Sequence, residues 1–239
     1  MKTISFKRCK QKAMSFSNKI ILSLFILFPV TGKSQIGLIF GGKFNQAPGW
    51  IITDLNNNSK IDLVGKAFYG GIDFEFNYGA YRIAFVPELN FSFYQKETTD
   101  LGQFSSRMFR FQLNTHIYFL DFKGDCHCPT FSKKGSPLKK GLYLNISPGA
   151  GFLENNISSS SFAEKNLYFF ANIGVGIGYD IGINKNLTLT TFVNGYYFPS
   201  LKWDGLTSLL ALPSSGNRRA SSLTSLEQIQ TGAVLRYHF

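Results

Sequence analysis

Strict alternation of apolar and polar side chains is the feature that most constrains how this 239-residue chain folds. It is clearest over Arg107–Phe122, where two sets of residues occupy alternate positions. One set is Phe109, Phe111, Leu113, Thr115, Ile117 and Phe119, and the other is Arg110, Gln112, Asn114, His116 and Tyr118. Because successive side chains of a strand point to opposite faces, this segment predicts a strand with one apolar and one polar face.

The same alternation recurs along the chain after residue 35. It marks seven further segments: Ile36–Asn45, Lys66–Tyr78, Tyr81–Tyr94, Gly141–Phe152, Leu167–Asp180, Leu187–Pro199 and Leu223–Phe239. A tilted membrane strand needs about 9–11 residues, and each segment is long enough. A soluble sandwich would cover its second face with Lys and Glu, but charged residues are only 16% of the chain. We therefore predict an all-β fold, a transmembrane up-and-down antiparallel β-barrel of eight strands.

The predicted connections between strands alternate in length. The long ones are 46–65, 95–106, 154–166 and 200–222, and the short ones are 78–80 and 182–186. Outer-membrane barrels have short periplasmic turns and longer external loops, so this pattern predicts which ends of the strands are external. The single exception is the long connection 123–140, which falls on the predicted periplasmic side.

Residues 1–34 have the form of a secretory signal. They contain seven basic and no acidic residues, an apolar run over Ile20–Val30, and small residues at Gly32 and Ser34. We predict that 1–34 is a signal peptide cleaved before Gln35, and that 35–239 is the barrel domain. Without this segment 18 basic residues face 14 acidic ones, so the net charge falls from +11 to +4. A nucleic-acid partner is therefore not expected.

The chain ends with apolar residues at every second position, Leu235, Tyr237 and Phe239. This ending resembles the C-terminal assembly signal of outer-membrane barrels. Together with the eight strands, it makes 35–239 similar to the small outer-membrane β-barrels of the porin family, of the OmpA/OmpX type. The resemblance implies the outer membrane of a Gram-negative bacterium, contact with its lipid, and recognition of the C-terminus by the barrel-assembly machinery. It implies no activity, because this fold hosts adhesins, anchors, pores and enzymes.

The interior of an eight-stranded barrel is narrow enough for side chains to fill it. The residues predicted to form a polar network there are Lys43, Asp73, Glu75, Arg82, Glu88, Arg110, His116 and Arg236. Unpaired charges in such a space are costly, so we expect acidic and basic side chains to pair into a plug. Inward-facing glycines, Gly149 and Gly151 in one strand and Gly174, Gly176 and Gly178 in the next, would leave room for bulky neighbours.

A plugged interior favours a structural or accessory role without enzymatic activity and without a cofactor. The alternative is a narrow porin-like channel for small solutes. A third hypothesis, a membrane-embedded lipid-modifying enzyme, calls for catalytic groups at the external rim. The histidines of the mature chain, His116, His127 and His238, are not predicted there.

The connection 123–140 carries the most individual motif, Asp125-Cys126-His127-Cys128. Export places Cys126 and Cys128 in an oxidising compartment, so a disulfide within the turn is our prediction. A zinc site lacks a second pair of ligands nearby. Intermolecular bonding, free thiols and a periplasmic partner at this turn stay open.

Overall fold

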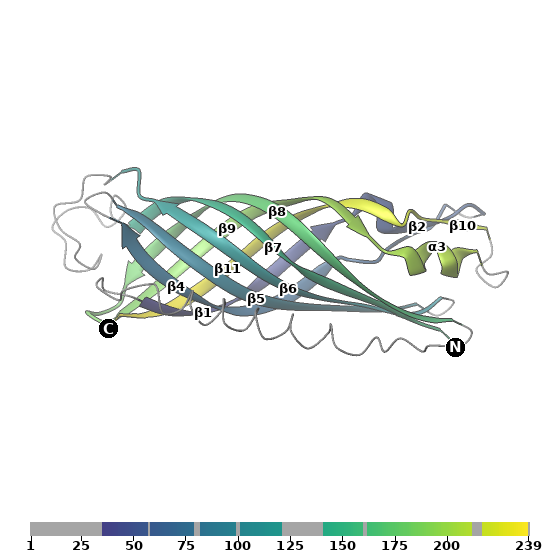
Figure 1. Ribbon diagram of the computed structural model, residues 1–239, viewed down its shortest axis with the longest axis horizontal. Coiled ribbons are helices and arrows are strands. Elements are labelled where there is room, and N and C mark those ends of the chain that lie inside the picture. The colour runs from purple at the N-terminus through teal and green to yellow at the C-terminus, as the bar shows by residue number, and fades with distance from the viewer. Residues whose placement is uncertain are drawn as a thin grey trace, which may run out of the picture. The chain divides into compact units, whose positions relative to one another are not determined.

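The computed structural model describes residues 35–56, 58–78, 82–98, 101–120, 141–159, 162–211 and 217–238, without the side chains of residues 77 and 78. Eight long antiparallel strands close into a barrel (Figure 1). They are β1 (Gln35–Gln46), β4 (Lys66–Tyr78), β5 (Ile83–Thr98), β6 (Gly102–Ile117), β7 (Leu142–Ser158), β8 (Ala163–Gly182), β9 (Leu187–Lys202) and β11 (Leu223–His238). Each strand pairs with the next along the chain, and β1 closes against β11, which confirms the predicted fold class.

Three predictions fall outside the described residues. They concern the signal peptide over 1–34, the disulfide between Cys126 and Cys128, and the terminal Phe239. All three stay predictions. None of the helices in the described part of the chain is long and apolar enough to cross a bilayer.

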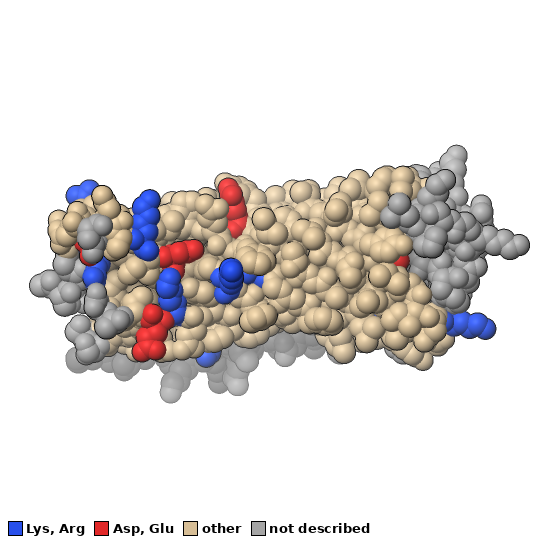
Figure 2. Space-filling view, turned by 180° about the vertical axis from the view of Figure 1, so that it is seen from behind, with Lys and Arg blue, Asp and Glu red and all other residues tan. Residues whose placement is uncertain are grey.

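An apolar belt surrounds the barrel because the alternation turns one face of every strand outward. Its exposed side chains include Phe40, Phe68, Phe91, Phe109, Leu144, Phe169, Val175, Val193, Ile229 and Tyr237. Figure 2 shows one face of this surface, on which most charged side chains gather toward one end. A closed barrel of long antiparallel strands that exposes such a belt is a transmembrane barrel of the outer-membrane type.

The predicted length of two connections is wrong, because both are short. The ladder of β5 and β6 continues to Thr98 and Gly102, and that of β7 and β8 continues to Ser158 and Ala163. The connections are therefore residues 99–101 and 159–162. The apolar set ends at the edge of the belt, but backbone pairing continues beyond it, so hydrophobic periodicity underestimates these strands.

The described parts of the two remaining long connections on that side fold into a cap, which we define as residues 47–56, 58–65, 203–211 and 217–222. The first contains η1 (Pro48–Trp50), β2 (Ile51–Asp54) and β3 (Lys60–Asp62), and the second contains α3 (Asp204–Leu210) and β10 (Arg218–Arg219). Strand β2 pairs with both β3 and β10, so the two connections share one small sheet. We call this end of the barrel the cap end.

An apolar core lies between the cap and the inner faces of the strands. Trp50 and Trp203 meet edge to face with ring centroids 5.3 Å apart, and Phe104 contacts Trp203 in the same way at 6.1 Å. The core also includes Ile52, Leu63, Met108, Leu153, Ile157, Phe170, Phe198, Leu201, Leu206 and Leu209, all buried. This core was not predicted, because both connections lack the alternation that marks the strands and were expected only as loops.

Candidate functional site

The barrel interior holds the charged residues that the sequence analysis selected. Seven of the eight are at most 5% exposed: Lys43, Asp73, Glu75, Glu88, Arg110, His116 and Arg236. The eighth, Arg82, lies in the turn before β5, where it is half-buried and its guanidinium lies 4.3 Å from the centre of the Tyr118 ring. The eight residues do not form one network, but several separate arrangements.

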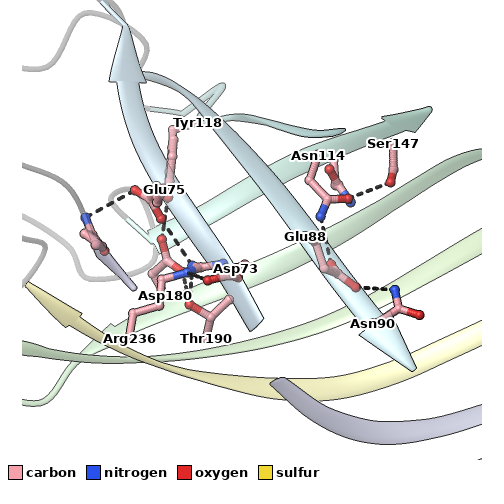
Figure 3. A network of polar contacts seen from close by, with 12 residues as sticks. Asp73, Glu75, Glu88, Asn90, Asn114, Tyr118, Ser147, Asp180, Thr190 and Arg236 are labelled. Atoms are coloured by element: carbon pink, nitrogen blue, oxygen red, sulfur yellow. Dashed lines mark hydrogen bonds and ion pairs between the residues drawn. The ribbon is translucent and has the colours of Figure 1, made fainter. Parts of the chain in front are cut away.

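The Arg236 cluster is the most charged of these arrangements (Figure 3). The guanidinium Nη2 of Arg236 lies 2.8 Å from Oδ2 of Asp73, and Nη1 lies 3.3 Å from Glu75 and 3.7 Å from Asp180. Nη1 also donates to the hydroxyl of Thr190 at 2.9 Å. These residues come from β4, β8, β9 and β11, so the cluster ties the barrel together across its interior.

Neutral donors add to the coordination of two of the three carboxylates, Asp180 and Glu75. The Tyr118 and Thr190 hydroxyls each donate to Asp180 at 2.5 Å, and the Gln35 amide donates to Glu75 at 3.3 Å. A buried ion pair is stable only when hydrogen bonds satisfy the remaining lone pairs, and these donors supply them. Asp180 ends one of the predicted strands but was not selected for the network, because nothing in the sequence reveals its distance from Arg236.

No carboxylate in the described part of the chain forms an ion pair with Arg110, which corrects the expected ion pairing. It donates to the side-chain carbonyls of Gln228 at 2.9 Å and Gln230 at 2.5 Å. Its guanidinium also lies 4.3 Å from the centre of the Tyr196 ring. Register and reach across the lumen decide these contacts, and neither can be derived from alternation.

Lys43 and Glu88 are likewise held by neutral partners. Lys43 donates to Asn90 and Ser92, each at 3.2 Å. Glu88 accepts from the amides of Asn90 at 2.7 Å and Asn114 at 2.8 Å (Figure 3). Asn90 therefore links a buried cation to a buried anion that do not touch. These neutral residues were not selected from the sequence, although Asn114 belongs to the polar set of its predicted strand.

The network continues through Asn114, which accepts from Ser147 at 2.6 Å and from Asn145 at 3.3 Å. Asn145 also donates to Asn194, and Asn194 donates to the Tyr196 hydroxyl. Hydrogen bonds thus cross the lumen in several directions. Such a network rigidifies an interior when most of its members are satisfied.

Bulky side chains fill the spaces over the inward glycines, as expected. A Cβ added to Gly178 would lie 2.2 Å from the Tyr143 ring, and one added to Gly174 would lie 2.2 Å from the Tyr196 ring. Tyr143 also stacks on His116, with ring centroids 4.0 Å apart. His116 is thereby enclosed among aromatic side chains inside the barrel.

A small cavity separates the polar network from the apolar core. Its volume is about 30 Å³, and its lining includes the polar residues Asn45, Ser92 and Gln228 and the apolar residues Trp50 and Met108. This is room for about one or two water molecules. Among the described residues, no group of three or more His, Cys, Asp and Glu side chains is placed to hold a metal ion.

Comparisons with known proteins give likeness of fold. No protein-family model matches the sequence, and no curated protein matches it. Among solved structures, the chain is similar to Ail, the attachment invasion locus protein of Yersinia pestis, at 12% identity and a TM-score of 0.48, covering 86% of this chain and 98% of that one. It is also similar to Neisserial surface protein A at 9% identity and a TM-score of 0.45, covering 86% and 97%. The outer membrane protease OmpT of Escherichia coli gives 9% identity and a TM-score of 0.40, covering 87% and 97%. Identities and scores this low leave the function to be argued from the chain's own residues.

Proposed function

We propose that this protein is an outer-membrane barrel with a structural or accessory role, and that its lumen is closed to solutes. The observation that carries the proposal is that two sets of side chains fill the interior, a polar one and an apolar one. We call them the two fillings of the lumen. Arg110 and Arg236, which are 0% and 2% exposed, lie within hydrogen-bonded networks that cross the lumen. The apolar core around Trp50 and Trp203 closes the cap end above them.

The alternative is a narrow channel for small solutes. Its path would have to cross both fillings, and the cavity between them has room only for about one or two water molecules. A channel would therefore require the cap and the network to rearrange together.

The positions of the described histidines support a role without catalysis. His116 is buried in the lumen, stacked on Tyr143. His238 lies at the end opposite the cap, where its Nε2 is 2.7 Å from the Thr188 hydroxyl. Neither lies at the cap end, where a lipid-modifying enzyme would meet an external substrate.

The proposed partners follow from the outer surface. The belt contacts membrane lipid, and Leu235 and Tyr237 face outward near the end of β11, where the assembly machinery would recognise them together with Phe239. A periplasmic partner at the turn with Cys126 and Cys128 belongs to the same proposal, and it rests on the sequence alone.

Conductance in planar lipid bilayers tests the closed lumen. Purified protein, folded as judged by its heat-modifiable electrophoretic mobility, should give no large, steady current at any applied voltage below membrane breakdown. A known open porin prepared in the same detergent is the control for insertion. Large, steady current steps from the unmodified protein would contradict the closed lumen and support the alternative, a narrow channel.

A further inference from the structure

The small cavity between the polar network and the apolar core has several hydrogen-bonding groups in its lining. They belong to Asn45, Ser92, Tyr94, Ser106 and Gln228. None of the lining residues in the described part of the chain is acidic. The space holds one or two water molecules or one monatomic ion of similar size, but no larger anion such as phosphate. The orientation of the lining groups therefore decides between water and an ion.

Arg110 fixes the orientation of two amides in the lining. Its guanidinium can only donate, so it bonds to the carbonyl Oε1 of Gln228, at 2.9 Å. The Gln228 amide nitrogen in turn donates to Oδ1 of Asn45 at 2.6 Å, and the Asn45 amide nitrogen donates to the backbone carbonyl of Gly65 at 2.9 Å. Both side-chain oxygens therefore already accept a hydrogen bond, whereas each amide nitrogen keeps a second hydrogen.

Lys43 orients Ser92 in the same way. The Lys43 ammonium donates to the Ser92 hydroxyl oxygen at 3.2 Å, so the hydroxyl hydrogen is directed away from Lys43. Trp50, in the apolar part of the lining, has a buried indole N–H without a hydrogen-bond partner among the described residues. Ser106 differs, because its hydroxyl donates to Asn155 at 2.6 Å and offers the cavity only its oxygen. Donors therefore outnumber acceptors around the cavity, which favours an occupant that accepts hydrogen bonds.

The buried charge next to the cavity is positive. Lys43 and Arg110 are 1% and 0% exposed, and one hydrogen-bonded side chain separates each of them from the cavity. Their printed partners in the described part of the chain are all neutral, and Glu88 is the carboxylate of this part of the network. The other buried carboxylates face Arg236 instead. Two buried cations with one carboxylate leave a positive charge whose burial is costly, and an anion in the cavity would lower that cost.

We propose that this cavity is a chloride site. The ion accepts hydrogen bonds from the Trp50 indole, the Ser92 hydroxyl and the two lining amides, and it compensates the charge of Lys43 and Arg110. It joins the cap to the barrel, because Trp50 belongs to the cap and Ser92 to β5. This inference is independent of whether the lumen conducts.

Fluorescence tests the site, because Trp50 and Trp203 are the two tryptophans of the chain. Bromide is close to chloride in size and quenches an indole that it touches. Trp203→Phe leaves Trp50 as the single tryptophan. Trp50→Phe is the matched control, because the Trp203 indole N–H is also buried without a partner among the described residues, but Trp203 is not one of the described lining residues.

Each variant is refolded into lipid vesicles in mixtures of bromide and gluconate at constant ionic strength, and checked for heat-modifiable mobility. We expect the Trp50 emission of Trp203→Phe to fall to a plateau as bromide increases, and added chloride to restore it. Trp50→Phe should show no plateau, because Trp203 is 1% exposed and bromide in solution does not reach it. Chloride in place of gluconate should also raise the urea midpoint of the unsubstituted protein, since a ligand of the folded state stabilises it.

Trp50 emission that does not respond to bromide would show that the cavity holds water, and would overturn the proposal. A plateau of the same size in both variants would place the bromide outside the cavity and overturn it as well. If either variant fails to fold, crystals of the unsubstituted protein grown in bromide give the answer. An anomalous peak between Trp50 and Ser92 supports the chloride site, and a cavity without such a peak excludes it.

Discussion

Arg236 illustrates how a narrow barrel keeps a charge inside. Its guanidinium faces three carboxylates and a hydroxyl, and two of those carboxylates, Glu75 and Asp180, have further donors. Arg110 is as deeply buried, but its partners are the neutral amides of Gln228 and Gln230. The two arginines therefore differ in what their removal leaves behind.

We predict that Arg236→Met lowers the free energy of unfolding by about 3–5 kcal/mol, because it leaves buried carboxylates uncompensated. Arg110→Met leaves neutral carbonyls without a donor and should cost about 1–3 kcal/mol. Urea unfolding in lipid vesicles measures both. Equal losses would mean that the carboxylates around Arg236 do not depend on it for their charge balance.

The inward glycines give a second comparison between single residues. A Cβ at Gly174 would lie 2.2 Å from the Tyr196 ring, whereas the nearest atom to a Cβ at Gly195, on the outer face, is 3.9 Å away. Gly174→Ala should therefore destabilise the barrel by about 1–3 kcal/mol through overpacking. Gly195→Ala is the matched control and should leave the unfolding midpoint unchanged. If both variants lost the same amount of stability, the cause would be the effect of replacing glycine on the backbone and not a clash with the Tyr196 ring.

At the scale of elements, the strands were predictable and their ends were not. Alternation gave all eight strands and their faces, since lipid outside and side chains inside impose a period of two over the membrane. It could not show that β5 continues past Gln95, because outside the membrane the outer face no longer has to be apolar. The contact of Arg110 with Gln228 could not be predicted from the sequence either, because it depends on strand register and on the width of the lumen.

The cap is an element that the sequence did not reveal, and its stability depends on few side chains. Trp203 is 1% exposed and contacts both Trp50 and Phe104. Trp203→Ala should cost about 3–5 kcal/mol locally by leaving a cavity. We expect faster proteolysis within 203–222 while heat-modifiable mobility is kept. Loss of that mobility would show that the barrel itself requires the cap.

At the scale of the whole molecule, assembly is expected to depend on the last residue. Leu235 and Tyr237 are 39% and 46% exposed on the outer face, and the alternation continues to Phe239 in the sequence. Deleting Phe239 should lower the amount of protein in the outer membrane and leave a periplasmic precursor. Fractionation and immunoblotting measure this, with Phe239→Tyr as the control that keeps an aromatic terminus. Unchanged levels of folded protein in the outer membrane would show that the assembly machinery does not require Phe239.

The two fillings of the lumen lie in series, so a solute path exists only when both are open. Arg110 anchors the network below the cavity, and Trp203 anchors the core above it. We therefore predict that Arg110→Ala and Trp203→Ala each leave planar-bilayer conductance near the baseline. The triple variant with Arg236→Ala, which also removes the Arg236 cluster, should conduct, because widening one segment of a path has little effect while another still blocks it. Folding of all three variants is checked by heat-modifiable mobility before recording. If Trp203→Ala alone conducts, the network is permeable and the cap is what closes the lumen. If the triple variant stays closed, other side chains fill the lumen as effectively as these three.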